Sequence, residues 1–247
     1  ANYGGGSVIS YQLESDGRIG AQASFVQHEG SSVNPNRQKA PHAHGIYLDQ
    51  AARFAFVPDL GMDKVLVYRF DATTGKLTPN DPAGVAIEPG SGPRHFALHP
   101  TKPLAWSLNE MVSTITSLKY DPVRGTLEPT TTVSTLPAGP VAGNSTAEIF
   151  VHPNGKFLYA SNRGHDSIAV FQIDGEAGAL TPVQHEPIAG RTPRSFVLDA
   201  GGRWLLAAGQ SSDTIAIFRL DPETGRITRT GNPMTAPTPV CLVFAAR

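Results

Sequence analysis

The sequence predicts an all-β fold built from repeated short strands. An acidic closing phrase occurs four times, as DATTGKL, DPVRGTL, DGEAGAL and DPETGRI. These phrases end at Leu77, Leu127, Leu180 and Ile227 and so recur every 47 to 53 residues, and a fainter copy, ESDGRI, ends at Ile19. The 25 glycines and 21 prolines of the chain suit a fold with many turns. Repeats of about 40–50 residues that contain several strands are typical of the four-stranded blades of a β-propeller.

Each repeat contains apolar runs separated by turn signals. In the third complete repeat we expect strands over 147–151, 157–161 and 168–173, with the acidic turn at 174–180 leading into a fourth strand. Pro-Asn-Gly at 153–155 predicts the turn between the first two, because glycine adopts positive φ without steric cost. The third strand, with alternating β-branched and aromatic residues, is also expected over 65–70, 114–120 and 215–220.

Composition narrows the partners of the chain. Its 247 residues are compatible with a single β-propeller domain over 1–247, and the formal net charge of −1 with no basic run disfavours nucleic acid or an anionic membrane. No apolar stretch approaches the roughly 18–20 residues that cross a bilayer. The single cysteine, Cys241, excludes an internal disulfide framework. We therefore expect a cytoplasmic protein without nucleic-acid or membrane partners.

Alignment of the repeats predicts which side chains meet. The first strand of each blade lines the axis of a propeller, and the second runs antiparallel to it, so the first strand starts and the second ends at the same mouth. The leading positions of the first strands are His44, Arg94, Ala147, Arg194 and Val240. The ends of the second strands supply Asp59, Glu110, Arg163 and Gln210.

This predicted mouth collects arginines beside carboxylates and a histidine. A guanidinium group donates two parallel hydrogen bonds to carboxylate or phosphate, and a nearby carboxylate or imidazole can act as a general base toward water. An anionic small molecule is the expected ligand. Purely structural roles stay open: Arg94 and Arg194 would then form ion pairs between blades, and Glu110 would only neutralise the arginines.

Four histidines allow other interpretations. His42 and His44 form a His-x-His pair, which on a strand points both rings to one face, as a metal site requires. No third ligand follows from the repeat geometry, so we expect no metal and no other cofactor. His99 and His152 precede prolines at turns of the opposite mouth, where structural roles are expected.

The phrases at these positions resemble a known family. They are ANYGGGSV (1–8), HAHG (42–45), VPDLGMDKVLVY (57–68), GSGPRHFALHP (90–100), NE (109–110), LYASNRGHDSIAVF (158–171), TPRSFVLD (192–199) and TPVCLVF (238–244). They extend over nearly the whole chain and are similar to the lactonase family of seven-bladed β-propellers.

The resemblance implies hydrolysis of the lactone ring of 6-phosphogluconolactone to 6-phosphogluconate, a step of the pentose phosphate pathway. The implied catalytic residues are His44 (or its neighbour His42), Arg94, Glu110 and Arg163. Glu110, with or without His44, would activate water, and Arg94 would stabilise the oxyanion. The residues expected to contact the substrate are His42, Asp59, Asn109, Glu148, Asn162 and Arg194.

Two other functions fit the same mouth. The family includes a cyclase that forms a muconolactone, and such an enzyme would use His44 as the proton donor. A non-catalytic propeller that binds a peptide would instead need large exposed aromatic anchors.

The chain, with 247 residues, is shorter than a member of this family should be, because seven repeats need about 350 residues. We therefore expect that the N-terminal blade or blades are missing from this chain. Residues 1–13 would be later strands of a blade, and closure would come from a partner fragment, a dimer or a five-bladed geometry.

Overall fold

The computed structural model describes residues 1–245, and these form strands joined by turns and loops. Three complete blades are four-stranded sheets in which each strand pairs antiparallel with the next one along the chain. Their strands are β3 (Tyr47–Leu48), β4 (Phe54–Asp59), β5 (Lys64–Asp71) and β6 (Lys76–Ala86); β7 (Pro93–Leu98), β8 (Leu104–Asn109), β9 (Thr114–Asp121) and β10 (Thr126–Ser134); and β11 (Ser145–Val151), β12 (Phe157–Arg163), β13 (Ser167–Asp174) and β14 (Ala179–Pro187).

Two further sheets flank these blades. β1 (Ser7–Leu13) and β2 (Ile19–Gln27) pair with each other. The last sheet contains β15 (Pro193–Leu198), β16 (Trp204–Gly209) and β17 (Thr214–Leu220), and its outer strand is split into β18 (Ile227–Arg229) and β19 (Met234–Thr235), which both pair with β17. The all-β fold of four-stranded sheets is thus confirmed.

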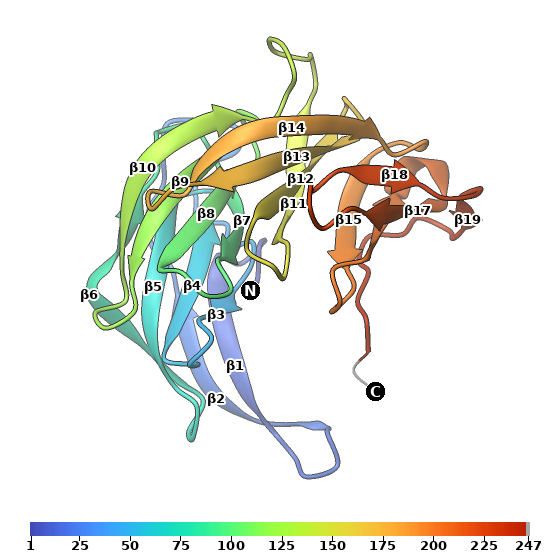
Figure 1. The fold of residues 1–247 in the computed structure, drawn as a ribbon. Helices are drawn as coiled ribbons and strands as arrows, with labels where there is room; N and C mark the ends of the chain where they lie inside the picture. The colour runs from blue at the N-terminus through green and yellow to red at the C-terminus, as the bar shows by residue number, and fades with distance from the viewer. Residues whose placement is uncertain (246–247) are drawn as a thin grey trace.

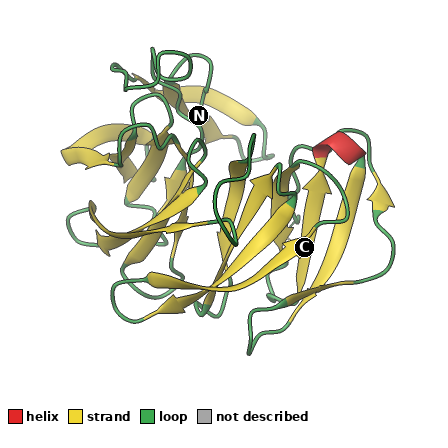
Figure 2. Ribbon diagram, turned by 90° about the horizontal axis from the view of Figure 1, so that it is seen from above, coloured by secondary structure: helices red, strands yellow, loops and turns green. Residues whose placement is uncertain are grey.

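The sheets stand side by side in an arc, from β1–β2 in blue to β15–β19 in orange and red (Figure 1). The first strands β7, β11 and β15 lie on the inner side of the arc, and the last strands β6, β10 and β14 lie on the outer side. The short 3₁₀ turn η1 (Gln210–Ser212) is the one helical element of the described residues (Figure 2). No helix within residues 1–245 is long and apolar enough to cross a membrane.

The hydrophobic core lies between neighbouring sheets. Each of its four clusters combines residues of two adjacent blades. Phe56 of one blade stacks on Phe96 of the next at 5.0 Å and meets Tyr120 edge-on at 5.2 Å. Phe150 and Phe196 meet edge-on at 5.4 Å between later blades. Such aromatic contacts fix each blade against its neighbour.

The repeated acidic phrase forms the turn between the third and fourth strands. In DPVRGTL the Asp121 carboxylate accepts hydrogen bonds from the Val123 and Arg124 amides, and the Gly125 amide donates to the Asp121 carbonyl at 2.8 Å. Gly125 has a φ of 72°, and a Cβ there would approach the Phe54 ring to 2.3 Å. Only glycine combines a positive φ with the absence of a Cβ atom, so the turn can pack closely against the preceding blade.

Two expected first strands differ in the structure. The first strand expected to begin at His44 is reduced to β3, because Pro58 accepts a hydrogen bond from the His44 amide but has no N–H to return. The first strand expected to begin at Val240 does not form, so Val240 does not lead a fifth inner strand. No segment of residues 1–245 pairs with it there, and the Leu242 amide donates to Ser195 Oγ instead.

Candidate active site

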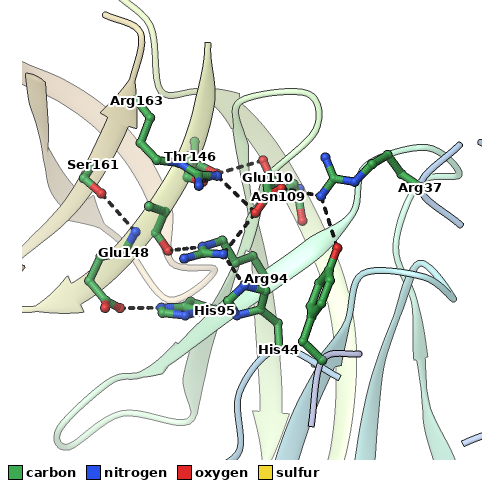
Figure 3. A network of polar contacts seen from close by, with 12 residues as sticks. Arg37, His44, Arg94, His95, Asn109, Glu110, Thr146, Glu148, Ser161 and Arg163 are labelled. Carbon is green, nitrogen blue, oxygen red and sulfur yellow. Dashed lines mark hydrogen bonds and ion pairs between the residues drawn. The ribbon is translucent and has the colours of Figure 1, made fainter. Parts of the chain in front are cut away.

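A cavity of about 380 Å³ lies at the end of the blades where the first strands start. We call this end the arginine mouth. The lining residues are Tyr3, Arg37, His44, Arg94, Glu110, Arg163 and Arg194. All four catalytic residues predicted from the sequence therefore lie together, and Figure 3 shows them pointing toward one another from three neighbouring blades.

Strand direction brings Arg94 and Glu110 together. Arg94 is the second residue of β7, and Glu110 directly follows β8, which runs antiparallel to β7. The Glu110 amide donates to the Gly92 carbonyl at 2.8 Å and so closes this end of the strand pair. Arg163, the last residue of β12, reaches the same point from the neighbouring blade.

The Glu110 carboxylate is the centre of the site. Arg94 and Arg163 each contact its Oε2 atom at 3.1 Å, and Arg37 contacts Oε1 at 2.7 Å. Burial alone would raise the pKa of Glu110. The hydrogen bond from Arg37 and the charges of the arginines outweigh this and lower the pKa to about 2. Glu110 is therefore ionised at neutral pH.

His44 is held against Arg94. The Arg94 Nη1 group donates to His44 Nε2, since a guanidinium has no acceptor atom. The hydrogen of a neutral ring is then on Nδ1, a buried atom without a partner among the described residues. Burial, followed by the charge of Arg94, lowers the pKa of His44 to about 2. His44 is thus neutral at pH 7, with its lone pair already occupied.

Positive charge is in excess at the arginine mouth. Four guanidinium groups and one carboxylate line the cavity, and His44 adds no charge. Burial lowers the pKa of Arg94, but only to about 10, so this group stays protonated. Within residues 1–245, Arg194 has no carboxylate partner. The cavity is therefore suited to an anionic ligand.

Three predicted substrate contacts are turned away from the cavity. Asp59, Asn109 and Asn162 are fully buried; Asp59 binds His28 Nδ1 at 2.6 Å, and Asn109 and Asn162 bond to threonines. The strand register shows why. Asp59, Asn109 and Asn162 pair with the first residues of β5, β9 and β13, whereas Glu110 and Arg163 come one position later. Successive side chains point to opposite faces, so Leu60, and not Asp59, is equivalent to Glu110.

His42 and Glu148 lie beside the cavity without lining it. His42 stacks on Tyr3 at 4.5 Å, and its Nδ1 binds the Tyr3 carbonyl at 2.9 Å. Glu148 pairs with His95 Nδ1 at 2.5 Å, and the His95 ring meets His44 edge-on at 5.1 Å. His42 thus contacts the lining residue Tyr3, and the Glu148–His95 pair (Figure 3) lies beside the lining residue His44. Within residues 1–245, no three His, Cys, Asp or Glu side chains are grouped as a metal site would require.

The repeat alignment missed Arg37 and Tyr3. Arg37 belongs to the irregular segment 28–46, which has no counterpart in the other blades, and Tyr3 precedes β1. Arg37 Nη2 donates to Tyr3 Oη at 3.2 Å as well as to Glu110. A repeat alignment compares only equivalent positions, so no signal in it could find them.

Comparison with known proteins places the chain in a family. The family described as "Lactonase, 7-bladed beta-propeller" matches residues 1–244. The chain belongs to this lactonase family. The 6-phosphogluconolactonase of Bacillus subtilis is 33% identical over 184 residues, which cover 74% of this chain and 51% of the relative. That of Pectobacterium carotovorum is 32% identical over 186 residues, or 75% of this chain and 52% of the relative.

Several solved structures superpose closely on the chain. The periplasmic gluconolactonase PpgL of Pseudomonas aeruginosa has a TM-score of 0.91 at 32% identity, and the match covers 100% of this chain and 69% of that one. A protein from Lactobacillus plantarum has a TM-score of 0.92 at 33% identity, covering 98% and 69%. The chain spans about half the length of the curated relatives it matches.

Proposed function

We propose that this chain carries the active site of a lactone hydrolase that opens 6-phosphogluconolactone to 6-phosphogluconate, the pentose phosphate pathway step. The observation that carries the proposal is the cavity with four arginines around one ionised carboxylate. A sugar phosphate supplies the negative charge that this cavity lacks. The relatives named 6-phosphogluconolactonase support the same substrate class.

In the proposed reaction, Glu110 takes a proton from a water molecule that attacks the lactone carbonyl carbon. Negative charge develops on the carbonyl oxygen, and the Arg94 guanidinium donates hydrogen bonds to it. The carbonyl re-forms, the ring C–O bond breaks, and the departing ring oxygen takes the proton from Glu110. The net change is addition of one water molecule, which gives a new hydroxyl group and a carboxylic acid; the acid then releases its proton to solvent and becomes a carboxylate.

The other lining residues have distinct proposed roles. Arg163 and Arg194 bind the phosphate or the carboxylate formed in the reaction, because they lie beside Glu110 with donors to spare: Arg163 Nε has no partner among the described residues. His44 positions Arg94 by accepting its hydrogen bond. A base role for His44 is disfavoured, because the lone pair on its Nε2 atom is already occupied by the hydrogen bond from Arg94.

The lowered pKa of His44 also weighs against the muconate-type cyclase. That reaction would need His44 to deliver a proton, and the neutral, buried ring is a poor acid at pH 7. A peptide-binding module would need several aromatic anchors, and Tyr3 is the one aromatic ring besides His44 in the cavity lining. The cytoplasmic location and the closing partner fragment or dimer stay predictions.

The test is the rate of 6-phosphogluconolactone loss above its spontaneous hydrolysis, with unphosphorylated gluconolactone in parallel. We expect faster loss of the phosphorylated lactone, with a smaller effect on the neutral one. No acceleration of either by folded protein would contradict the proposal. Product analysis with a muconate-type dicarboxylate tests the cyclase in the same preparation.

A further inference from the structure

The two oxygens of the Glu110 carboxylate are held differently. Oε2 accepts a hydrogen bond from Arg94 and forms an ion pair with Arg163, each at 3.1 Å. Among the described residues, Oε1 is held by Arg37 alone, at 2.7 Å (Figure 3). Loss of one contact, that of Arg37, would therefore leave Oε1 free to accept a proton while Oε2 stays anchored.

The three arginines also differ in how firmly they are fixed. The Arg94 side chain is 4% exposed and donates Nε to the Ala147 carbonyl at 2.8 Å. The Arg163 side chain is 14% exposed and donates to the Thr146 carbonyl at 2.8 Å. Both belong to strands, so moving either would leave a backbone carbonyl unpaired.

Arg37 has no such anchor. Its side chain is 43% exposed and comes from the irregular segment 28–46, and its hydrogen bonds go to Glu110 and the Tyr3 hydroxyl. Water can solvate the guanidinium when it leaves Glu110, and its departure leaves no backbone carbonyl unpaired. An incoming phosphate, with more charge than one carboxylate, competes well for this group.

We propose that Arg37 couples substrate recognition to catalysis: the anionic group of the substrate draws the Arg37 guanidinium away from Glu110 Oε1, and that oxygen then accepts the proton of the attacking water. This inference rests on the function proposed above and adds Arg37 as a positioning residue that acts through Glu110. A neutral lactone does not displace Arg37, so Glu110 Oε1 remains bonded to Arg37 and cannot accept the proton of the water.

The electrostatics of the free site agree with this coupling. The charged and titratable groups facing Glu110 are Arg94 on β7, Arg163 on β12, Arg194 on β15, Arg37 and Tyr3 on the N-terminal segments, and His44 before β3. After burial, the hydrogen bond from Arg37 is the largest influence on the pKa of Glu110, and it lowers it. Removing that bond and adding a substrate anion both raise this pKa, which makes Glu110 a better base at neutral pH.

The kinetic test compares Arg37→Ala with the wild type on phosphorylated and neutral lactones. We expect the preference for the phosphorylated lactone, measured as a ratio of kcat/KM, to fall about tenfold or more. The kcat for the neutral lactone is expected to hold or rise. The acidic limb of its pH profile should move up by about one pH unit, because a charge-assisted bond to Glu110 is gone. Arg18→Ala, which removes an exposed arginine paired with Asp16, is the matched control.

Equal losses of kcat on both lactones, with an unchanged pH profile, would overturn the coupling. A second readout does not depend on turnover. Calorimetric titration with 6-phosphogluconate near pH 4, in buffers of different ionisation enthalpy, reports proton uptake on binding. We expect uptake in the wild type that is reduced in Arg37→Ala and in Glu110→Gln; equal uptake in all three would overturn the proposal.

The two readouts separate the two proposals. Proton uptake without lactone hydrolysis would contradict the proposed function and support the coupling. Hydrolysis by the wild type, together with equal losses of kcat on both lactones in Arg37→Ala, would support the proposed function and contradict the coupling.

Discussion

The two mouths of the propeller both hold buried histidines, but the partners of these rings differ. At the opposite mouth, His152 Nε2 binds the Gly202 carbonyl of the next blade at 2.8 Å, and the Asn154 amide donates to its Nδ1. His99 repeats this arrangement with the Gly155 carbonyl and the Lys102 amide. At the arginine mouth, His44 binds the Arg94 side chain and its Nδ1 has no partner.

This difference distinguishes polar groups with a fixed structural partner from polar groups whose partner a ligand can replace. A side chain bonded to backbone on both sides cannot change partner without leaving a buried backbone group unpaired. At the arginine mouth, Glu110 and Arg37 are satisfied by other side chains, which a charged ligand can replace. The contacts of His99 and His152 are those expected for the structural roles predicted for them, and the contrast supports the proposal that the arginine mouth binds the ligand.

The largest expected effect is that of Glu110→Gln on turnover. Glutamine keeps the shape and loses the basic oxygen, so kcat for 6-phosphogluconolactone should fall by about 10²–10⁴-fold. Steady-state kinetics with a check of folding by circular dichroism measures this. A variant with wild-type kcat would remove Glu110 from the base role.

Arg163→Ala should act mainly on binding. We expect KM for the phosphorylated lactone to rise about 10- to 100-fold, since one charge-assisted contact to an anion is lost. The neutral lactone is the control in the same assay. Equal changes with both lactones would contradict a role of Arg163 in binding the phosphate.

His152→Ala tests the opposite mouth. The free energy of unfolding should fall by about 1–3 kcal/mol, because the Gly202 carbonyl loses its donor and the buried ring is removed. Urea denaturation measures the loss, and kcat per folded molecule should stay unchanged. A loss of kcat without a loss of stability would show that this mouth takes part in the reaction.

His44→Gln should weaken the acid sensitivity of the fold. The pKa of His44 is lowered from 6.5 to about 2, so below pH 6.5 the unfolded chain binds a proton there that the folded chain does not. Stability is then lost as the pH falls from 6.5, by up to about 1.4 kcal/mol per pH unit. Between pH 7 and 5 we expect the variant to lose about 1–2 kcal/mol less than the wild type in urea denaturation. Identical losses would contradict the shift.

Much of the architecture followed from local sequence signals. The turn from Asp to Gly marks where each blade ends, and the alternation of residues in the third strands shows which side chains face the neighbouring blade. The repeats could therefore be aligned, and His44, Arg94 and Arg194 were correctly predicted to lie at one mouth. The alignment of Asp59 with Glu110 was wrong by one position, because the ends of the second strands differ in sequence. The register with the third strand of each blade shows that Asp59 is equivalent to Asn109.

Two aspects could not be predicted. The repeat pattern carries no information about the segment 28–46, which brings Arg37 to Glu110 from outside the repeats. The division of Glu110 contacts between its two oxygens depends on side-chain geometry that no spacing encodes.

The most direct test of the proposed site is a crystal structure of the chain with 6-phosphogluconate bound. We expect an anionic group of the product within hydrogen-bonding distance of Arg37 or Arg163, at the arginine mouth. A cavity of about 330 Å³ at the opposite mouth, lined in part by Arg53 and Lys102, offers the competing position. Product bound there, with the arginine mouth empty, would contradict the account.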